Sequence, residues 1–552
     1  LYQEGIDLSN EDILDTVVLF RLIKEDEMNY GLKRLAVKYL DASYGNAEKE
    51  LKSYMRRYKL KTYDAVPAEI ILPYVEKDLE ATEGLYKYCM PLIEERKLEE
   101  LLYLEKAVTK ALFKSEVCGI KIDRDHVEKQ QQEISDVIDE KHTELYKIVG
   151  YVFDTDKLEE IRNAFKGLGL KSSQITPKTN KEAWTKQVLQ QIDHPVATLL
   201  EQIRNLKKTK TAYYDNFLEY AGSDDVIHCS FHQAGTKSAR LSCSAPNIQQ
   251  ATRRRNPFFT EEEDVGQKVR GAFIPRPGCF LAGLDWSQVE VRIFADYAQE
   301  KSLVDAFKYG LDIHAMTALV AFGDSTGYHR DKAKEIVFGL LFGLGLEGLA
   351  ARLGNTRENT QAIMDRFFTR FPNARVFMRE VQRVCQNRGW IKNRWGRRRY
   401  LPRDKSYQGV SFLIQSTAAE LMKTAIVDVN TILQPFKTNL LLTVHDEIIL
   451  EVPYEEGSTV IPLVVAEMEK APKLNVPLKC DVSWFPERWS EKRSLECIQC
   501  GGLGIETNLS KEKLMRSLYE NDYAFLQTLQ EYPCSVCKGK RFDFSVLAYE
   551  NA

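Results

Sequence analysis

Residues 441–452 read LLTVHDEIILEV, and this stretch places two adjacent carboxylates in the middle of a strongly apolar run. The apolar residues on either side predict two short strands joined by a tight turn at His445, Asp446 and Glu447. Such a turn exposes the acids at one edge of a sheet, where negative charge is costly unless a cation lies nearby. A divalent metal ion is the usual partner, although a solvated turn has the same composition because Asp is common in turns.

A second carboxylate stands at the end of another apolar strand. Residues 279–286 have a strand pattern that runs into a helix pattern over 288–298, and Asp285 lies at the junction. Two aspartates on neighbouring strands can hold two Mg²⁺ ions roughly 4 Å apart. Because Mg²⁺ takes few protein carboxylates and completes its shell with phosphate and water, Asp285 and Asp446 are predicted to bind two Mg²⁺ (or Mn²⁺) ions for displacement at phosphate.

A cationic segment, HRDKAKEIVFGLLFG (329–343), follows between the two acids. Its residues Arg330, Lys334, Phe338 and Phe342 are spaced by four, so they share one face of a helix. A nucleoside triphosphate could lie with its phosphates on the cations and its sugar and base on the rings. A lone amphipathic helix with a solvated end would show the same pattern, but the two acids favour phosphate binding.

The bulk composition is that of an ordinary globular protein. The chain has 552 residues, 44% hydrophobic and 28% charged, and a net charge of −3. This charge does not exclude nucleic acid, because a binder can be basic along one groove only. The most apolar span, 337–350, is too short to cross a bilayer and contains Glu347. We expect a soluble cytoplasmic protein without a membrane partner and, since it begins at Leu1, a fragment or processed chain.

Taken together, these motifs resemble those of family A DNA polymerases, the DNA polymerase I kind. DWSQVE (285–290) resembles motif A, RDKAKEIVFGLLFG (330–343) motif B and HDE (445–447) motif C, in the family's order and spacing. The resemblance extends from about 118 to 489. Further matches are TKSARLSCSAPNIQQ (236–250), DIH (312–314), GRRRYLP (396–402) and IQSTAAELMK (414–423).

This resemblance implies an α+β fold shaped like a right hand, with an antiparallel palm sheet and helical fingers and thumb. Residues 1–100 are expected to be a partial 3′–5′ exonuclease-like domain, 101–490 the polymerase domain, and 491–552 a zinc-ribbon-like extension. Within the polymerase domain the expected parts are a thumb at about 118–225, a palm at about 226–300 and 391–490, and fingers at about 301–390.

The implied activity is template-directed DNA synthesis: a primer 3′ end grows by deoxynucleotides and pyrophosphate leaves. Its substrates would be primer-template DNA and deoxynucleoside triphosphates, and the enzyme would be a monomer. The compact size, with no visible 5′-nuclease domain, favours a phage-type replicative enzyme. The alternatives are a non-catalytic primer-template-binding protein and a single-subunit RNA polymerase. Glu290 and Glu447 favour DNA over RNA synthesis, and the presence of both aspartates argues against the non-catalytic binding protein.

The resemblance also assigns catalytic roles to matching residues. Asp285 and Asp446 would bind the metal ions, with Glu447 in support. Arg330 and Lys334 would hold the triphosphate, and Lys334 could give a proton to the pyrophosphate.

Further residues would form the nucleotide site. His314 would contact the same phosphates, and Gln288 would lie near the nucleotide. Glu290 would close the space at the sugar 2′ position, and Phe338 is the type that favours a 3′-hydroxyl sugar. Phe342 stands where the family usually has Tyr, so this chain lacks the hydroxyl that would help to order Glu290.

Several residues would contact DNA. Arg240, Gln415 and His445 would touch the primer-template near its terminus. The lysine-rich helix at 204–214 would belong to the thumb and attract the phosphate backbone. Its lysines Lys207 and Lys208, Arg254 in the run 253–255, and the arginines of 394–399 would line the DNA track, although each run could be a solvated face.

Near the start of the chain, Tyr74 and Asp78 fit the third exonuclease motif, in which Tyr orients a water and Asp binds metal. Any amphipathic helix can show the same spacing. The first two exonuclease motifs are not visible, and one or two acids hold two metals poorly. We therefore predict that this chain does not proofread.

The tail carries a CxxC…CxxC set formed by Cys497, Cys500, Cys534 and Cys537. Four thiolates are the number that a tetrahedral structural Zn²⁺ requires, so one Zn²⁺ is predicted. The alternative is two redox-active dithiols or unused thiols. A zinc ribbon here could contact DNA or a replisome protein.

Overall fold

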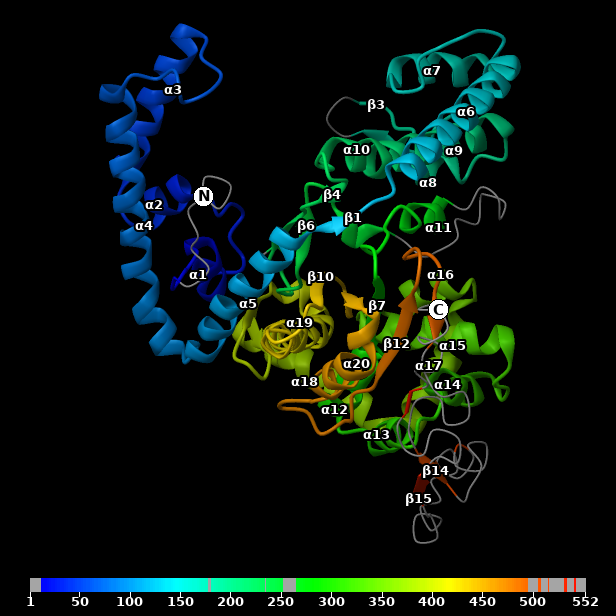
Figure 1. Cartoon of the computed structure of the whole chain (residues 1–552). Coiled ribbons are helices and arrows are strands. Elements are labelled where there is room, and N and C mark those ends of the chain that lie inside the picture. The colour runs from blue at the N-terminus through cyan, green and yellow to red at the C-terminus, as the bar shows by residue number, and fades with distance from the viewer. Residues whose placement is uncertain are drawn as a thin grey trace.

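The computed structural model describes residues 11–176, 180–233, 235–251, 265–494, 505–507, 515, 531–533 and 541–542. Figure 1 shows a central body from which two helical arms project on different sides. One arm comes from the start of the chain and contains α3 and α4, and the other contains α6, α7 and α9. The bounds of these helices are Asn46–Tyr58, Ala68–Arg96, Arg124–Val149, Leu158–Gly167 and Pro195–Thr209.

The body is built on a five-stranded antiparallel sheet in the order β10-β11-β7-β12-β13. These strands are Asn439–Val444, Glu447–Pro453, Cys279–Trp286, Cys480–Phe485 and Arg493–Ser494. The two central strands, β7 and β11, are buried along nearly their whole length. This burial on both faces explains why their sequences are continuous apolar runs rather than alternating patterns. The strand expected at 279–286 is confirmed.

Long helices cover this sheet. α12 (Val289–Ala298) begins directly after β7, and α19 (Gln408–Ile432) and α20 (Gly457–Met468) pack on one another and on the same core. α19 is buried along most of its length, which is why its sequence is apolar with few interruptions. The sheet and these helices together form the largest hydrophobic core among the described residues.

Residues 301–388 form helices only, as their periodicity predicts. They are α13 (Lys301–Lys308), α14 (Ile313–Phe322), α15 (Gly327–Leu341), α16 (Leu346–Leu353), α17 (Arg357–Arg370) and α18 (Pro372–Arg388). α14 packs along α15, and α12 also contacts α15. The chain then returns to the body through the hairpin of β8 (Trp390–Lys392) and β9 (Arg398–Tyr400).

The arm that contains α6 has a hydrophobic core of its own, formed mainly by α7 and α9. α9 continues into a π-helical segment, η3, and then into α10. At the base of the arm, β1 pairs with β4, and the nearby hairpin of β5 and β6 leads toward β7. The bounds are Lys210–Asp215 for η3, Asn216–Tyr220 for α10, Ile120–Lys121 for β1, Val226–Ile227 for β4, Ser230–His232 for β5 and Ser242–Ser244 for β6. Shorter elements are β2 (Ile175–Thr176), β3 (Lys181–Glu182), α8 (Lys186–Leu189), η4 (Ile248–Gln250), α11 (Val265–Arg270), η5 (Arg403–Lys405) and η6 (Tyr454–Glu456).

All regular elements in residues 11–118 are helices. Besides α3 and α4 they contain α1 (Thr16–Ile23), α2 (Leu32–Tyr39), η2 (Ala42–Gly45) and α5 (Glu99–Cys118). α5 connects this arm to the body, where it packs against α19.

Near the end of the chain, β14 (Ile505–Thr507) pairs antiparallel with β15 (Glu531–Pro533). The four tail cysteines, 497, 500, 534 and 537, lie outside the described residues. The seven described cysteines are free thiols. Among the helices that the structure describes, none has the length and apolar character needed to span a membrane.

Candidate active site

The hairpin of β10 and β11 is present as the sequence predicts, but its turn is one residue shorter than expected. Val444 pairs with Glu447, so His445 and Asp446 alone form a two-residue turn. His445 has a φ of 60°, the positive value that a type II′ turn has at its first central position. Glu447 is already the first residue of β11 and not part of the turn. The turn therefore presents Asp446 at one end of the central strands.

The two predicted aspartates meet at that end. Asp285 lies directly opposite Glu447 in the β7–β11 register. The backbone N–H of Trp286 donates to the carbonyl oxygen of Asp446 over 3.2 Å, which brings the two chain segments together. On the other side of β7, Asp481 of β12 also lies opposite Asp285. Because opposed residues in antiparallel strands share a face, Glu447, Asp285 and Asp481 point the same way.

Sequence reasoning missed Asp481. The signal was an acid near the start of the strand pattern CDVSWF (480–485), but only the register shows that it neighbours Asp285. Its Oδ1 lies 2.9 Å from the ammonium of Lys479, which compensates part of its charge. Asp481 therefore enlarges the acidic end of the sheet without adding a full uncompensated charge.

The electrostatics of Asp446 suit a cation site. Burial is the main cause that raises the pKa of Asp446 to about 6. The negative charges of Glu290 and Glu447 act in the same direction, and the guanidinium of Arg240 opposes them. A bound divalent ion would reverse this effect. Within the described ranges, no three or more His, Cys, Asp or Glu side chains are grouped to hold a metal by themselves. Two carboxylates are the set that Mg²⁺ uses when phosphate and water supply its other ligands.

Glu447 is held differently from the aspartates. Its Oε2 lies 3.8 Å from the Nη1 of Arg270, and both side chains are buried. The guanidinium of Arg270 in turn lies 4.1 Å from the ring centroid of Trp489. A Cβ atom at Gly283 would come within 2.5 Å of Oε1 of Glu447, so glycine leaves the room that this carboxylate occupies. These contacts hold Glu447 opposite Asp285, and its supporting role stays a prediction.

The turn after β7 carries two further predicted residues. Gln288 has a φ of 54° and precedes α12, and its buried Oε1 has no hydrogen-bond partner in the described structure. Glu290, in the first turn of α12, forms an ion pair with Arg240. Burial lowers the pKa of His445, and Arg240 lowers it further. Since Arg240 acts on both His445 and Asp446, the structure gathers these residues around the hairpin turn.

The predicted cationic face lies on α15. The rings of Phe338 and Phe342 stack with their centroids 6.1 Å apart, and the ring of His314 on α14 lies 6.0 Å from that of Phe338. Arg330 Nε donates to Asp312 Oδ2 over 2.6 Å. Lys334 is exposed and forms no ion pair with any part of the chain that the structure describes. It is therefore available to an anionic ligand.

His314 is a buried neutral donor or acceptor. Burial lowers its pKa to about 4, with the cations Lys334 and Arg330 acting in the same direction. Its Nδ1 is buried without a hydrogen-bond partner among the described residues. The neighbouring Asp312, which sequence reasoning did not single out, accepts from the backbone N–H groups of His314 and Ala315 and so caps α14. Asp312 thereby links the helix that carries His314 to Arg330.

The predicted DNA contacts are spread over three regions. Arg240 lies just before β6, and Gln415 is half-buried on α19. Lys207 donates to Asp156 over 2.8 Å, whereas Lys208 is exposed. Arg254 lies outside the described residues.

Three arginines of the run at 394–399 pair with acids of the described chain, and contact of this run with DNA stays a prediction. Arg394 pairs with Asp296 and Arg399 with Glu25. Arg397 is buried between carboxylates of α5 and α19. The run is dense in charge because each of these arginines meets an acid from a distant part of the chain, which local sequence cannot show.

Tyr74 and Asp78 lie together on α4, as their spacing predicts. The ammonium of Lys33 forms an ion pair with Asp78 and lies 4.7 Å from the ring centroid of Tyr74. Burial and the neighbouring Asp78 raise the pKa of Tyr74 to about 12. Asp78 thus already has a protein cation beside it.

An antiparallel sheet with two aspartates at one end, beside a helix that presents cations and aromatic rings, defines a palm-type polymerase fold. A solved structure described as the POL domain of Pol1 from M. smegmatis in complex with DNA primer-template and dNTP superposes with a TM-score of 0.72. The two sequences are 26% identical, and the superposition covers 86% of this chain and 82% of the M. smegmatis chain. The sequence model of DNA polymerase family A matches residues 124–491, and the chain belongs to this family.

Curated relatives include DNA polymerases I from several bacteria. The thermostable enzyme of Thermus aquaticus is 32% identical over 413 residues, which are 71% of this chain and 49% of the relative. The enzyme of Bacillus caldotenax is 30% identical over 483 residues, 81% of this chain and 54% of the relative. The chain thus spans about half the length of the curated relatives it matches. The predicted family and the right-hand α+β fold are confirmed.

Proposed function

We propose that the chain is a template-directed DNA polymerase that adds deoxynucleoside triphosphates to a primer 3′ end and releases pyrophosphate. The observation that carries this proposal is the meeting of Asp285 and Asp446 at one end of β7 and β11. The similarity to proteins named DNA polymerase I, and to a polymerase domain solved with primer-template and dNTP, supports the same activity.

Asp285 and Asp446 would hold two Mg²⁺ (or Mn²⁺) ions. When bound, such ions lower the pKa of an attacking hydroxyl and neutralise charge on the leaving pyrophosphate. The raised pKa of Asp446, caused mainly by burial, supports this assignment, because a nearby cation favours the charged form of a buried carboxylate. Glu447, fixed by Arg270, would keep the aspartates in place.

The α15 face would bind the nucleotide. Arg330 and Lys334 would form charge-assisted hydrogen bonds to the triphosphate, and Lys334 would give a proton to the departing pyrophosphate. His314 stays neutral at physiological pH, so it would donate one hydrogen bond to a phosphate oxygen without adding charge. Phe338 and Phe342 would contact the sugar and base.

Glu290 would select the sugar. Its carboxylate is held by Arg240, so it has a fixed place at the start of α12 from which it would exclude a 2′-hydroxyl. Gln288, one residue before α12, would approach the nucleotide with its unpartnered Oε1. The hydroxyl that the family usually supplies at position 342 is missing, and the ion pair with Arg240 would order Glu290 in its place.

The primer-template would run from the thumb to the palm. Lys208 is exposed and would meet backbone phosphate, and Lys207 would exchange Asp156 for phosphate on binding. Arg240, Gln415 and His445 would contact the duplex near the primer terminus. Arg254 would add a further cation to the track.

We assign the thumb to about 118–225, the palm to about 226–300 and 391–490, and the fingers to about 301–390. Residues 1–100 would be an exonuclease-like remnant that does not proofread, since Lys33 neutralises Asp78. The four tail cysteines would hold one structural Zn²⁺ in residues 491–552, a surface for DNA or a replisome protein. The enzyme would act as a monomer in a bacterial cytoplasm, as a phage-type replicase.

Primer extension tests the proposal. A labelled primer-template is incubated with Mg²⁺ and either deoxynucleotides, ribonucleotides or no nucleotide. The active-site variant is Asp446→Ala, and the matched control is Asp26→Ala, which removes an exposed carboxylate from the N-terminal arm. We expect growth with deoxynucleotides only, lost in Asp446→Ala and kept in Asp26→Ala, and no shortening without nucleotide.

Other outcomes would point elsewhere. Primer-free synthesis from ribonucleotides would identify an RNA polymerase. Tight primer-template binding with no incorporation in any lane would identify a non-catalytic DNA-binding protein. Shortening of the primer without nucleotide would contradict the absence of proofreading.

A further inference from the structure

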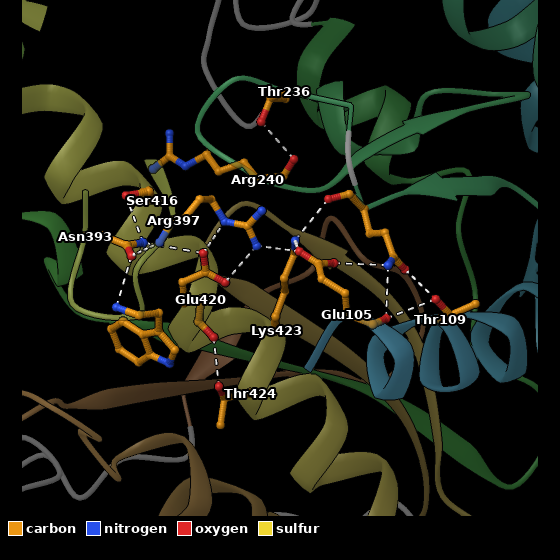
Figure 2. A network of polar contacts seen from close by, with 12 residues as sticks. Glu105, Thr109, Thr236, Arg240, Asn393, Arg397, Ser416, Glu420, Lys423 and Thr424 are labelled. Atoms are coloured by element: carbon orange, nitrogen blue, oxygen red, sulfur yellow. Dashed lines mark hydrogen bonds and ion pairs between the residues drawn. The ribbon is translucent and has the colours of Figure 1, made fainter. Parts of the chain in front are cut away.

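Four charged side chains form a cluster inside the body (Figure 2). Glu105 of α5, Glu420 and Lys423 of α19, and Arg397 of the β8–β9 turn are each at most 5% exposed. Arg397 Nη2 lies 2.5 Å from Glu105 Oε1, and its Nε binds Glu420. Lys423 Nζ lies 2.6 Å from the same Glu105 oxygen. Two cations and two anions thus compensate one another.

Stability alone does not explain such a cluster. Burying charges costs solvation, and well-packed apolar residues of the same volume are often equally or more stabilising. A polar cluster does specify geometry, because each donor and acceptor is satisfied in one arrangement only. The cluster therefore fixes the position of the backbone and side chain that it contacts.

This backbone and side chain belong to Gln233, which follows β5 directly. Lys423 Nζ donates to its backbone carbonyl over 3.0 Å. Its Nε2 donates to both the backbone carbonyl and Oε2 of Glu105, each over 3.0 Å. Its Oε1 accepts from the hydroxyl of Thr109, also over 3.0 Å. Gln233 is 8% exposed, and α5 and α19 hold it from two sides.

Gln233 begins the segment that ends at Arg240. Thr236 Oγ1 donates to the backbone carbonyl of Arg240 over 2.9 Å, which closes the segment at its far end. Ala239, just before Arg240, is buried and has a φ of 61°. The guanidinium of Arg240 then pairs with Glu290. Contacts thus hold both ends of this short segment, Gln233 in the buried cluster and Arg240 at the start of α12, and the backbone joins the two ends.

We propose that Glu105, Lys423 and Gln233 are positioning residues that set Arg240 against Glu290, and thereby set the sugar selection of the nucleotide site. This inference rests on the proposed polymerase function. Glu105 belongs to α5, which precedes the residues 124–491 that match the family. The selectivity of the site would thus depend on a helix that precedes the residues matched by the family model.

The chain offers a matched pair of mild variants. Thr109 and Thr424 are both helical threonines whose hydroxyls bond to the carbonyl four residues earlier, that of Glu105 and that of Glu420 respectively. Only the Thr109 hydroxyl also reaches Gln233. Thr109→Val should therefore disturb Arg240, and Thr424→Val should not. Gln233→Met is the stronger variant, and Thr109→Val replaces it if Gln233→Met fails to fold.

A double-mutant cycle on the full chain tests the route through Arg240. Single-nucleotide incorporation is measured for wild type, Gln233→Met, Arg240→Ala and the double variant, with deoxy- and ribonucleotides. We expect Gln233→Met to lower kcat/KM for deoxynucleotides about tenfold, because small misplacements cost up to about 10²-fold. In the Arg240→Ala background this loss should shrink to within about twofold. Equal losses in both backgrounds would overturn the proposal.

Hydrogen–deuterium exchange gives a readout that needs no activity. Exchange of the amides at 235–241 and at the start of α12 should rise in Gln233→Met and Thr109→Val and stay unchanged in Thr424→Val. Exchange unchanged in all variants would overturn the positioning role. A wild-type chain that incorporates no nucleotide would refute the proposed function, while the exchange result would still decide the positioning of Arg240.

Discussion

Removing one charge from the buried cluster should destabilise the body strongly. Lys423→Met keeps most of the side-chain volume but removes the ammonium that faces Glu105 and the carbonyl of Gln233. Because Lys423 is fully buried, water cannot take its place. Breaking a buried pair by removing one partner costs about 3–5 kcal/mol. Arg397 still contacts Glu105, so we expect a value near the lower limit, about 3 kcal/mol.

Urea unfolding followed by tryptophan fluorescence measures this loss. The second variant, Glu105→Gln with Lys423→Met, removes the opposing charge as well. Because the amide that replaces the carboxylate of Glu105 could still hydrogen-bond, the double variant should recover part of the stability, and the two single losses should not add. A loss below about 1 kcal/mol for Lys423→Met would refute the reasoning, since a solvated ion pair costs no more than that. Full additivity in the double variant would show that the two side chains do not interact.

Three further predictions concern the nucleotide site. Asp312→Asn keeps the cap of α14 but weakens the charge-assisted bond that orients Arg330. Steady-state kinetics should therefore show a KM for deoxynucleotides raised roughly threefold to tenfold, with kcat nearly unchanged, and a lower KM would contradict this prediction. Glu290→Ala should raise the kcat/KM ratio of ribo- to deoxynucleotides roughly 10- to 200-fold in single-turnover incorporation, and an unchanged ratio would exclude a sugar-selecting role. The folded-state pKa of His314 is lowered to about 4, so the unfolded chain binds more protons between pH 6.5 and 4 and stability falls as pH decreases there. Urea unfolding at pH 7 and pH 5 should show about 2 kcal/mol more loss in wild type than in His314→Gln, and equal losses would contradict the burial of a neutral imidazole.

The sequence was most informative where function depends on neighbours along the chain. The hairpin that carries Asp446 could be predicted because β10 and β11 are consecutive and buried, so their apolar runs flank the turn directly. The α15 face could be predicted because Arg330, Lys334 and Phe338 are related by helical spacing alone. In both cases local periodicity determines which side chains lie together.

Contacts between residues from distant segments of the chain could not be predicted from local sequence patterns. Arg397 lies 292 residues from Glu105, so nothing near the arginine run indicates that it is buried. The charge density of 394–399 is typical of a solvated surface, and only the fold supplies the acids that pair with Arg394, Arg397 and Arg399. Asp481 neighbours Asp285 through strand register, which depends on a sheet order of β11-β7-β12 that no local pattern specifies.

The buried cluster also bears on where the functional unit begins. Arg397 and Lys423 face two carboxylates, and one of them, Glu105, comes from α5. Without α5, two buried cations would face Glu420 alone, and Gln233 would lose every partner of its side chain. An uncompensated buried charge is among the most destabilising changes that a core can undergo. The smallest stable and selective unit therefore includes α5, although the family match starts only at residue 124.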